Sequence, residues 1–452
     1  MRKFTVKEAT LATLGHLEGG GEDNYITGVT MDSRKVEKGF LFVAIKGERV
    51  DGHDFINDVF EKGAAAVLCD HVPDGVTDPC IVVKNTVKAL QDLAEWYRLS
   101  LDIKVVGITG SVGKTSTKEV VSAVLAAKYR VQKTLGNYNN EIGLPLTVLA
   151  TEPDTEILVL EMGISDFGEM RVLSKVAHPD ICVITNIGQC HLEFLHDRDG
   201  ILRAKSEIFE YMNPKGSIYL NGDDDKLITL KNVNGIVPTF FGFSNTNEAY
   251  PKSMESLGLK GSKMHLSLKD TEFDAIINIP GRHMVLNATA AAAIGHDLAM
   301  TDNEIIEGLN RAKTISGRSN IIESRYGCVI DDCYNASPAS MKSAIDTLCL
   351  GIGKKLAILG DMFELGEKSD EMHAEVGEYA VSKEIDKLIC VGENCKHMYD
   401  AAVKAGSKVT ISYFATLDEF LNVFEQEING YDNILLKSSH GMEFSKIIDI
   451  IK

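Results

Sequence analysis

The stretch KVVGITGSVGKTSTKE, residues 104–119, decides the fold of this chain. An apolar run over 105–108 leads into a glycine-rich turn, and a helix-forming segment begins at Lys114. This pattern predicts a strand, a phosphate-binding loop and a helix N-terminus, because glycines let backbone N–H groups approach an anion and the helix end offers free donors. Lys114 is expected near the β- and γ-phosphates of a nucleotide, and the hydroxyl of Thr115 on Mg²⁺.

The glycine spacing separates this loop from the common nucleotide-binding form. That form places a glycine where this chain has Ile108, whereas the glycines here are Gly107, Gly110 and Gly113. The alternative is a glycine-rich turn without a ligand, which the Lys-Thr pair at the helix start disfavours. The sequence therefore predicts a nucleotide loop of a variant type.

Length, composition and charge limit the class of protein. The chain has 452 residues, 44% of them hydrophobic and 25% charged, as in ordinary globular proteins of two or three domains. A formal net charge of −18 argues against nucleic-acid binding. Nine scattered cysteines without a CxxC motif indicate reduced thiols. Because neither a signal peptide nor a membrane-spanning apolar run is evident, we expect a cytoplasmic protein with no membrane span.

The order of apolar runs predicts an α/β fold in three domains, over residues 1–100, 101–315 and 316–452. The first mixes strands such as 39–45 and 64–70 with a helix over 87–100, where Trp96 and Tyr97 are interpreted as packing residues. Apolar runs of the second domain cover 104–109, 157–161, 181–187 and 217–220. Those of the third cover 328–332, 356–360, 388–392, 409–414 and 433–437, with helices such as 369–383 and 416–428 between them. This alternation predicts mostly parallel sheets with helices on both faces and ligands at the carboxyl ends of strands.

Several polar residues of the second domain follow predicted strands or turns. Glu161 ends an apolar run, where it is either a Mg²⁺ ligand or a solvent-facing acid. His191 either ligates a metal or donates a structural hydrogen bond, and Lys205 lies in a helical segment, where a lysine is normally solvated. Asn139 and Asn140 either bind a substrate or cap and turn the chain.

A second group of candidates lies toward the third domain. His283 is suited to stack on a base and Asn287 to read an adenine edge, although both also suit the entry of a helix. Arg318 is placed to close over a phosphoryl group. Asp331 and Asp332 end a predicted strand and either bind ribose hydroxyls or form an Asx turn.

Taken together, these segments resemble the Mur ligase family, the ATP-dependent amide ligases of peptidoglycan precursor synthesis. The resemblance covers nearly the whole chain and rests on eight segments in the family's order. They are 31–55, 107–119, 134–147, 161–163, 185–195, 204–209, 281–291 and 331–341. The resemblance implies a UDP-sugar-binding N-terminal domain, a central P-loop-type ATPase domain with a parallel sheet, and a Rossmann-like C-terminal domain.

The resemblance also implies roles for individual residues. Those expected to bind ATP phosphates are Gly110, Ser111, Val112, Gly113, Lys114, Thr115 and Ser116, and Arg318 is expected to join them. Glu161 and His191 would hold a second Mg²⁺, and Lys205 matches a lysine that CO₂ carbamylates into a metal ligand. The implied adenine and ribose contacts are His283, Asn287 and Asp332. The implied UDP-substrate contacts are Ser33, Arg34, Gly52 and His53, with Asn139 and Asn140 in the muramoyl-peptide region.

Three residues depart from the family pattern. Met284 stands where Asn usually follows the His of the GxHN segment, Ser337 stands where a YNANP pattern has Asn, and His440 stands where Arg is expected. These departures concern the adenine edge and the third-domain contacts rather than the phosphate loop.

The implied activity is an ADP-forming ligation through an acyl phosphate, catalysed with Lys114, Glu161, His191, Lys205 and Arg318. The implied substrates are ATP, UDP-N-acetylmuramoyl-tripeptide and D-alanyl-D-alanine, and a monomer is expected. The segments ITGSVGKTSTKE and NYNNEIG favour the addition of a dipeptide over that of a single amino acid. The alternatives are a single-amino-acid ligase of the same family and a nucleotide-switched binding protein without ligase activity.

Overall fold

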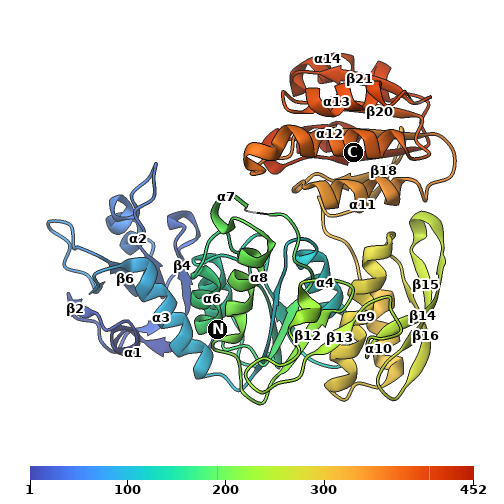
Figure 1. Cartoon of the computed structure of the whole chain (residues 1–452). Helices are drawn as coiled ribbons and strands as arrows, with labels where there is room; N and C mark the ends of the chain where they lie inside the picture. Colours follow the sequence, from blue (N-terminus) through green and yellow to red (C-terminus); the bar gives the residue numbers. More distant parts are fainter. Residues whose placement is uncertain (191, 407) are drawn as a thin grey trace.

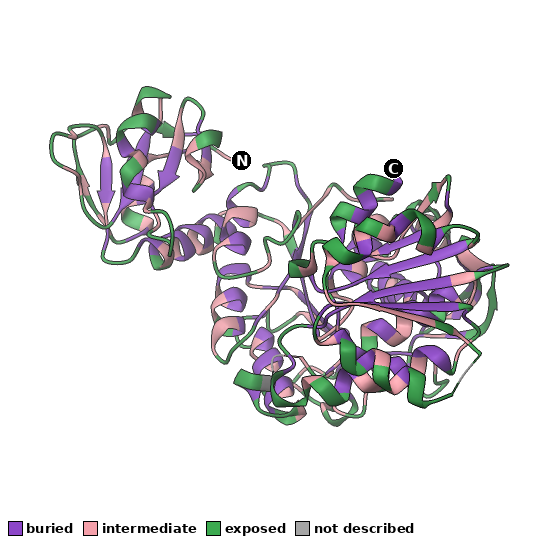
Figure 2. Cartoon of the chain, turned by 90° about the horizontal axis from the view of Figure 1, so that it is seen from above, coloured by how far each residue is buried: buried purple, intermediate pink, exposed green. Residues whose placement is uncertain are grey.

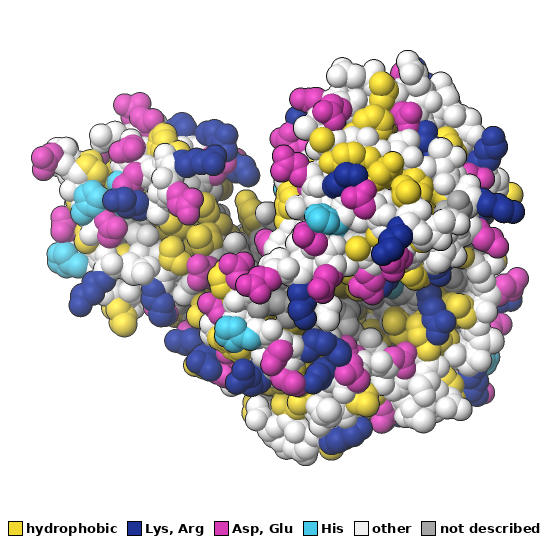
Figure 3. Space-filling view, turned by 45° about the horizontal axis from the view of Figure 1, so that its top comes forward, with side chains coloured by type: hydrophobic (Ala, Val, Ile, Leu, Met, Phe, Trp, Pro, Cys, Tyr) yellow, Lys and Arg dark blue, Asp and Glu magenta, His cyan; other side chains and the backbone are white. Residues whose placement is uncertain are grey.

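The fold consists of three α/β lobes that follow one another along the chain (Figure 1). A computed structural model describes residues 1–190, 192–406 and 408–452. In Figure 1 the N-terminal lobe (blue) stands beside the central lobe (green to yellow), and the C-terminal lobe (orange to red) lies above the central one. The space-filling view shows a deep notch between the N-terminal lobe and the rest of the molecule (Figure 3).

The N-terminal lobe contains a five-stranded sheet that is parallel except at one edge. Its strands, in spatial order, are β2 (His16–Glu18), β7 (Cys80–Val82), β6 (Ala66–Cys69), β5 (Phe40–Val43) and β4 (Gly28–Thr30), with β2 antiparallel to β7. Short strands β1 (Phe4–Thr5) and β3 (Tyr25–Ile26) form a separate pair. The helices are α1 (Val6–Ala12), α2 (Ile56–Glu61) and α3 (Thr86–Leu99). The strands expected within 39–45 and 64–70 and the helix expected over 87–100 are confirmed.

Helix α3 fastens the N-terminal lobe to the central lobe. The hydroxyl of Tyr97 donates to the Thr151 carbonyl at 2.8 Å, and Nε of Arg98 donates to the Ala177 carbonyl at 3.0 Å. Both side chains are buried. Tyr97 and its neighbour Trp96 also pack on Phe4, so their interpretation as packing residues is confirmed.

The central lobe is built on a six-stranded, fully parallel sheet. Its spatial order is β13 (Thr239–Phe241), β12 (Ser217–Asn221), β11 (Ile181–Ile184), β8 (Lys104–Thr109), β10 (Ile157–Glu161) and β9 (Val131–Lys133). Its helices are α4 (Lys114–Leu125), α5 (Gly143–Leu149), α6 (Glu169–Ala177), α7 (Leu192–Leu195), α8 (Arg198–Ser206), α9 (Arg282–Asp297) and α10 (Asp302–Arg311). In register, Glu161 of β10 lies opposite Ile108 of β8, and Ile184 of β11 lies opposite Thr109. The predicted strands therefore end side by side at the edge where the phosphate loop begins.

A three-stranded antiparallel sheet in the central lobe was not predicted. It comprises β14 (Tyr250–Ser256), β15 (Ser262–Ser267) and β16 (Glu272–Ile277). The side chains of β14 are mostly exposed, so this strand carries almost no apolar signal in the sequence. Strand β15 alternates instead, with Met264 and Leu266 buried between more exposed neighbours, as expected of a half-buried strand.

The alanine-rich helix α9 is buried in the core of the central lobe. It packs against α4, and the small side chains of its alanines allow the two helices to approach closely. Within the part of the chain that the structure describes, no helix is both long and apolar enough to cross a membrane.

The C-terminal lobe has a second six-stranded sheet with one antiparallel edge strand. Its spatial order is β17 (Asn320–Ser324), β18 (Gly327–Asp332), β22 (Asn433–Lys437), β19 (Lys355–Gly360), β20 (Lys387–Val391) and β21 (Thr410–Phe414). Its helices are α11 (Pro338–Leu348), α12 (Ser369–Val381), α13 (Cys395–Lys404), α14 (Leu417–Ile428) and α15 (Ser445–Ile451). Buried strands run between helices whose outer faces are exposed (Figure 2). The predicted alternation of strands and helices is therefore confirmed in this lobe.

Candidate active site

The glycine-rich loop connects β8 to α4 at the carboxyl edge of the central sheet. Gly110 has φ +149°, and a Cβ atom there would lie 1.9 Å from Oγ1 of Thr185. Gly113 has φ +86° and forms the N-cap of α4. Both positions therefore require glycine, the first for a close approach and the second for its backbone conformation. The predicted strand, turn and helix start are all present.

The segment that follows β11 holds this loop in place. The backbone N–H of Ser111 donates to the Asn186 carbonyl at 3.0 Å, and that of Val112 donates to Oδ1 of Asn186 at 3.0 Å. The Asn186 amide in turn donates to the Val112 carbonyl at 2.8 Å. Lys114 folds back over the loop, where its Nζ donates to the Gly110 carbonyl at 3.0 Å. A fixed loop, a lysine and the positive end of α4 together favour an anion.

Glu161 is a buried carboxylate directly beside this loop. Its side chain is 2% exposed, so the alternative of a solvent-facing acid is wrong. Oε1 accepts hydrogen bonds from Oγ1 of Thr115 at 3.1 Å and from Nδ2 of Asn139 at 2.8 Å. Oε2 has no hydrogen-bond partner among the described residues. Mg²⁺ prefers oxygen ligands. A buried carboxylate oxygen without a hydrogen-bond partner, next to a threonine hydroxyl, is therefore suited to bind this ion.

Lys118, one helical turn after Thr115, is a site residue that the sequence reasoning missed. Its Nζ is buried, donates to the Thr134 carbonyl at 2.9 Å, and lies 3.1 Å from Oε1 of Glu119 and 3.7 Å from Oε2 of Glu161. This cation compensates the buried charge of Glu161. The only signal in the sequence is that Lys118 and Glu119 are adjacent on a helix that packs against the central sheet. This signal is weak, because a lysine in a helix is usually solvated.

Lys205 is also buried, contrary to the expectation of a solvated helix lysine. Its side chain, on α8, is 1% exposed. Burial, with a smaller contribution from the charge of Lys114, lowers the pKa of Lys205 to about 8. At pH 7 about a tenth of such side chains are neutral amines, against far less than a hundredth for an ordinary lysine. His191, the other predicted ligand, lies outside the described residues, so its role stays a prediction.

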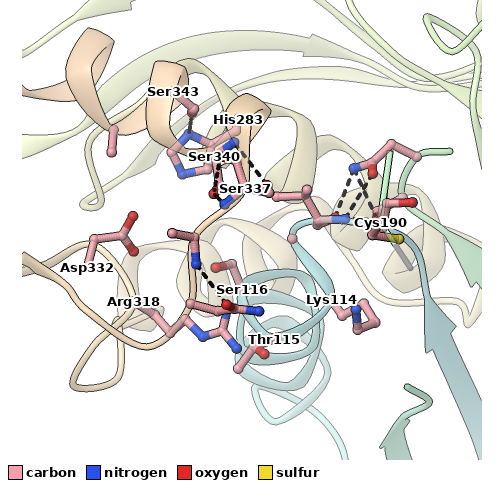
Figure 4. A pocket seen from close by; sticks show the side chains of 18 of the residues that line it. Lys114, Thr115, Ser116, Cys190, His283, Arg318, Asp332, Ser337, Ser340 and Ser343 are labelled. Atoms are coloured by element: carbon pink, nitrogen blue, oxygen red, sulfur yellow. Dashed lines mark hydrogen bonds between the residues drawn. The ribbon is translucent and has the colours of Figure 1, made fainter. Parts of the chain in front are cut away.

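A cavity of about 240 Å³ separates the phosphate loop from the C-terminal lobe. Figure 4 shows Lys114 and Thr115 on α4, with Arg318 on the segment that leads into the C-terminal lobe and Asp332 at the end of β18 in that lobe. Predicted nucleotide contacts that line the cavity are Ser111, Val112, Gly113, Lys114, Thr115, Ser116, His283, Asn287, Arg318 and Asp332. The structure therefore brings these residues, from two lobes, around one space.

The predicted adenine contacts lie at the start of α9. Nδ1 of His283 is 3.1 Å from Oγ of Ser343 on α11, so this pair links the two lobes. Burial lowers the pKa of His283, which keeps the ring neutral near physiological pH. Oδ1 of Asn287 accepts a hydrogen bond from Oγ1 of Thr117 at 3.0 Å, and its Nδ2 lies 3.5 Å from the sulfur of Met284. Met284, which departs from the family pattern, is thus buried against Asn287, three residues further along α9.

Arg318 supplies an unused donor on the C-terminal side of the cavity. Its guanidinium lies 3.9 Å above the ring of Tyr334. Its Nε is buried and has no hydrogen-bond partner in the described parts of the chain. A buried, unpaired guanidinium donor fits contact with a phosphoryl oxygen.

The two aspartates at the end of β18 hold the segment around Arg318. Oδ1 of Asp332 accepts the Ser319 N–H at 2.9 Å, and its Oδ2 pairs with Nζ of Lys437 at 2.5 Å. Oδ2 of Asp331 accepts the Gly317 N–H at 2.8 Å. Both carboxylates therefore already have protein partners, and Asp332 also faces the cavity.

The other two departures lie in the C-terminal lobe. Ser337 is the N-cap of α11, where its hydroxyl accepts the Ser340 N–H, with Pro338 at the first helical position. Serine and asparagine are comparable N-caps, so the replacement keeps the helix start. His440 is exposed, and its ring centroid lies 5.7 Å from that of Tyr334. The guanidinium of Arg318 stacks on the same tyrosine ring.

The predicted UDP-substrate contacts lie away from this cavity, in the N-terminal lobe. Ser33 and Arg34 belong to a 3₁₀ turn, Ser33–Lys35, after β4, and Gly52 and His53 to another, Gly52–Phe55, after β5. Because β4 and β5 are parallel neighbours, both turns lie toward one edge of the sheet. Arg34 is exposed and its guanidinium pairs with Asp32.

The two predicted muramoyl-peptide contacts differ in their surroundings. Asn139 donates to Glu161 and so joins the phosphate-loop wall. Oδ1 of Asn140 accepts the Ile142 N–H at 3.3 Å and the Gly143 N–H at 2.9 Å just before α5, so it turns the chain there, as in its alternative interpretation.

Comparison with known proteins agrees with this arrangement. Family models match at residues 25–98 (Mur ligase family, catalytic domain), 108–295 (Mur ligase middle domain) and 317–440 (Mur ligase, glutamate ligase domain). The UDP-N-acetylmuramoyl-tripeptide–D-alanyl-D-alanine ligase of Bacillus subtilis is 40% identical over 459 residues, which cover 100% of this chain and 99% of that relative.

Two solved structures also match. A crystal structure of MurF from Acinetobacter baumannii has a TM-score of 0.90 and 29% identity, covering 100% of this chain and 99% of that one. MurF ligase from Thermotoga maritima in complex with ADP has a TM-score of 0.83 and 31% identity, covering 94% and 96%. The chain belongs to the Mur ligase family.

Proposed function

We propose that the protein is an ADP-forming ligase that joins D-alanyl-D-alanine to UDP-N-acetylmuramoyl-tripeptide. The main observation behind the proposal is that Lys114 and Arg318, which come from two different lobes, line the same cavity. Full-length similarity to a ligase named for these substrates, and to a MurF structure that holds ADP, supports the choice of substrates and nucleotide.

The residues around the cavity suit phosphoryl transfer from ATP to a carboxylate. Such transfer needs alignment and charge neutralisation rather than covalent help. The N-terminus of α4 and Lys114 would hold the β- and γ-phosphates, and the unpaired Nε of Arg318 would bind the transferring group. The carboxylate oxygen of the tripeptide attacks the γ-phosphorus, and ADP leaves with an acyl phosphate formed.

Thr115 and Glu161 would hold Mg²⁺ at this site, together with His191 and with Lys205 in its carbamylated form. Mg²⁺ bound there supplies positive charge to the phosphates. In forming the carbamate, the neutral amine of Lys205 attacks the carbon of CO₂ and releases a proton. The buried, pKa-lowered amine supports this modification, because only the neutral form is nucleophilic.

The second half of the reaction requires that water be kept from the acyl phosphate. The amine of D-alanyl-D-alanine attacks the acyl carbon, and phosphate leaves from the tetrahedral intermediate. The C-terminal lobe forms one wall of the cavity, so its closure against the central lobe excludes water while the amine binds.

Each of the three lobes has its own task in this scheme. Residues 1–100 bind the UDP-sugar through Ser33, Arg34, Gly52 and His53, and the substrate lies along the notch in Figure 3. Residues 101–315 bind ATP, and residues 316–452 close the site. One chain carries the whole site and acts as a monomer in the cytoplasm, where its product serves peptidoglycan synthesis and thus cell shape and division.

An omission assay tests the proposed function. We expect phosphate release only when Mg-ATP, UDP-N-acetylmuramoyl-tripeptide and D-alanyl-D-alanine are all present, with a product heavier by one dipeptide in the mass spectrum. Single amino acids replace the dipeptide in a parallel series. Turnover with a single amino acid would assign another ligase of the family, and ATP binding without release would assign a nucleotide-switched binding protein.

The carbamate makes the enzyme depend on CO₂. Removing CO₂ from the buffer should lower phosphate release, and bicarbonate should restore it, faster as the pH rises toward the Lys205 pKa of about 8 because more amine is neutral. Lys205→Ala should lose about 10²-fold or more in turnover, with no rescue by bicarbonate. The exposed Lys215→Ala serves as the control. Full activity of Lys205→Ala would show that no carbamate is needed.

The buried pair of Lys118 and Glu161 predicts a stability coupling. Lys118→Met leaves the carboxylate of Glu161 buried without its cation, and should lower the free energy of unfolding by about 3–5 kcal/mol. Adding Glu161→Gln should recover more than about 1 kcal/mol of that loss, measured by urea denaturation. Lys104→Met, at an exposed position of β8, is the matched control. Strictly additive effects of the two substitutions would contradict the pairing.

A further inference from the structure

A cluster of histidines and aspartates in the N-terminal lobe lies outside the cavity described above. His53 is buried at the turn after β5, and Asp51 precedes it. Asp70 and His71 directly follow β6, the neighbouring parallel strand, and their side chains are 42% and 61% exposed. Two adjacent strands thus deliver these four residues to the same edge of the sheet.

Three of these side chains turn their ligand atoms toward one another. Oδ1 of Asp70 lies 3.2 Å from Nε2 of His53 and 2.5 Å from Nδ1 of His71. All three atoms lie within 4.8 Å of one another. The two imidazole rings are stacked, with centroids 4.4 Å apart. Because the side chain of His71 is 61% exposed, its ring has room to turn from Asp70 toward a shared ion.

Asp51 fixes which nitrogen of His53 is available. Its Oδ1 lies 2.6 Å from Nδ1 of His53, so the ring proton resides on Nδ1 and the lone pair on Nε2. The Asp70 N–H approaches Nε2 at 3.3 Å, a long hydrogen bond that agrees with this tautomer. A carboxylate on the far nitrogen of a histidine is the usual outer partner of a metal-binding imidazole.

Nε2 of His53 also lies near a carboxylate oxygen of Asp70, a pairing that a cation between the two atoms would stabilise. The 3.2 Å separation of Nε2 and Oδ1 is close to the edge of a tetrahedron with bonds of about 2.1 Å, roughly 3.4 Å. Two imidazoles and one carboxylate suit zinc and its neighbours in the first transition row, whereas Mg²⁺ prefers oxygen ligands alone. Solvent exposure of His71 leaves an entry path and room for a water ligand.

A second cluster of potential metal ligands, in the C-terminal lobe, differs from this one. Asp361, His373 and Cys395 also lie together, but they are fully buried. Nε2 of His373 accepts the Met362 N–H at 3.0 Å, and Oδ1 of Asp361 accepts the Cys395 N–H at 2.7 Å. All three side chains of this cluster are buried and two of its ligand atoms accept short backbone hydrogen bonds, whereas Asp70 and His71 are exposed. This second cluster is therefore a structural hydrogen-bond network.

We propose that His53, Asp70 and His71 bind a divalent transition-metal ion such as Zn²⁺, with Asp51 orienting His53. The site stands on the geometry of the N-terminal lobe and shares only His53 with the proposed UDP-sugar contacts, so its test uses protein without the UDP-substrate.

Cobalt titration of the full-length protein tests this site. Chelator-treated protein receives Co²⁺ in the presence of a large excess of Mg²⁺, which saturates oxygen-only sites. We expect visible d–d absorption that saturates at one equivalent and is displaced by Zn²⁺. His71→Ala, at an exposed position, should abolish the absorption, whereas His16→Ala, an exposed histidine of the same lobe, should keep it.

Asp51→Asn separates orientation from ligation. It should leave the shape of the absorption band intact and weaken Co²⁺ binding by about 10–100-fold. The proposal is overturned if no saturable Co²⁺ absorption appears, or if it is unchanged in His71→Ala. In that case His53 is an imidazole held by two aspartates and serves the lobe's structure alone.

Discussion

The buried carboxylate of Glu161 is the point on which the nucleotide site depends. It can be buried there only because Thr115 and Asn139 donate to one oxygen while Lys118 faces the other. Those partners come from α4 and from the segment after β9, and Glu161 itself ends β10. One side chain thus ties the phosphate loop to two neighbouring strands, and its second oxygen remains available for a metal ion.

The side of the cavity opposite Glu161 and the phosphate loop is formed by the C-terminal lobe. Arg318 lies where the chain enters the C-terminal lobe, and its segment is held by Asp331 and Asp332 rather than by the central sheet. His283 and Ser343 join the lobes by one further contact. The closure proposed for the C-terminal lobe would act at this junction between the two walls.

Much of the fold was predictable because its strands are buried and its loops carry strong signals. The phosphate loop needs glycine at Gly110 and Gly113 for steric reasons that the sequence displays directly. The inner strands of both large sheets are mostly apolar runs, as expected when helices cover both faces, whereas edge strands such as β9 are only half-buried. Strand β14 was missed because its exposed, polar side chains leave no periodic pattern.

The site was harder to predict where burial reverses a residue's ordinary behaviour. Lys118 and Lys205 read as solvated helix lysines, and only tertiary packing buries them. A local sequence pattern does not show which face of a helix is covered by other elements in the folded protein. Resemblance to a family supplied a role for Lys205 but none for Lys118. The structure adds that Lys118 is the cation beside Glu161.

The central claim is that the carboxylate of the tripeptide substrate is phosphorylated in the cavity between Lys114 and Arg318. The most direct test labels that carboxylate with heavy oxygen and follows the label by mass spectrometry of the released phosphate. The account predicts one labelled oxygen in each phosphate, because the attacking carboxylate oxygen leaves with the phosphoryl group. Unlabelled phosphate, released while the amide product forms, would contradict an acyl phosphate and with it this account of the cavity.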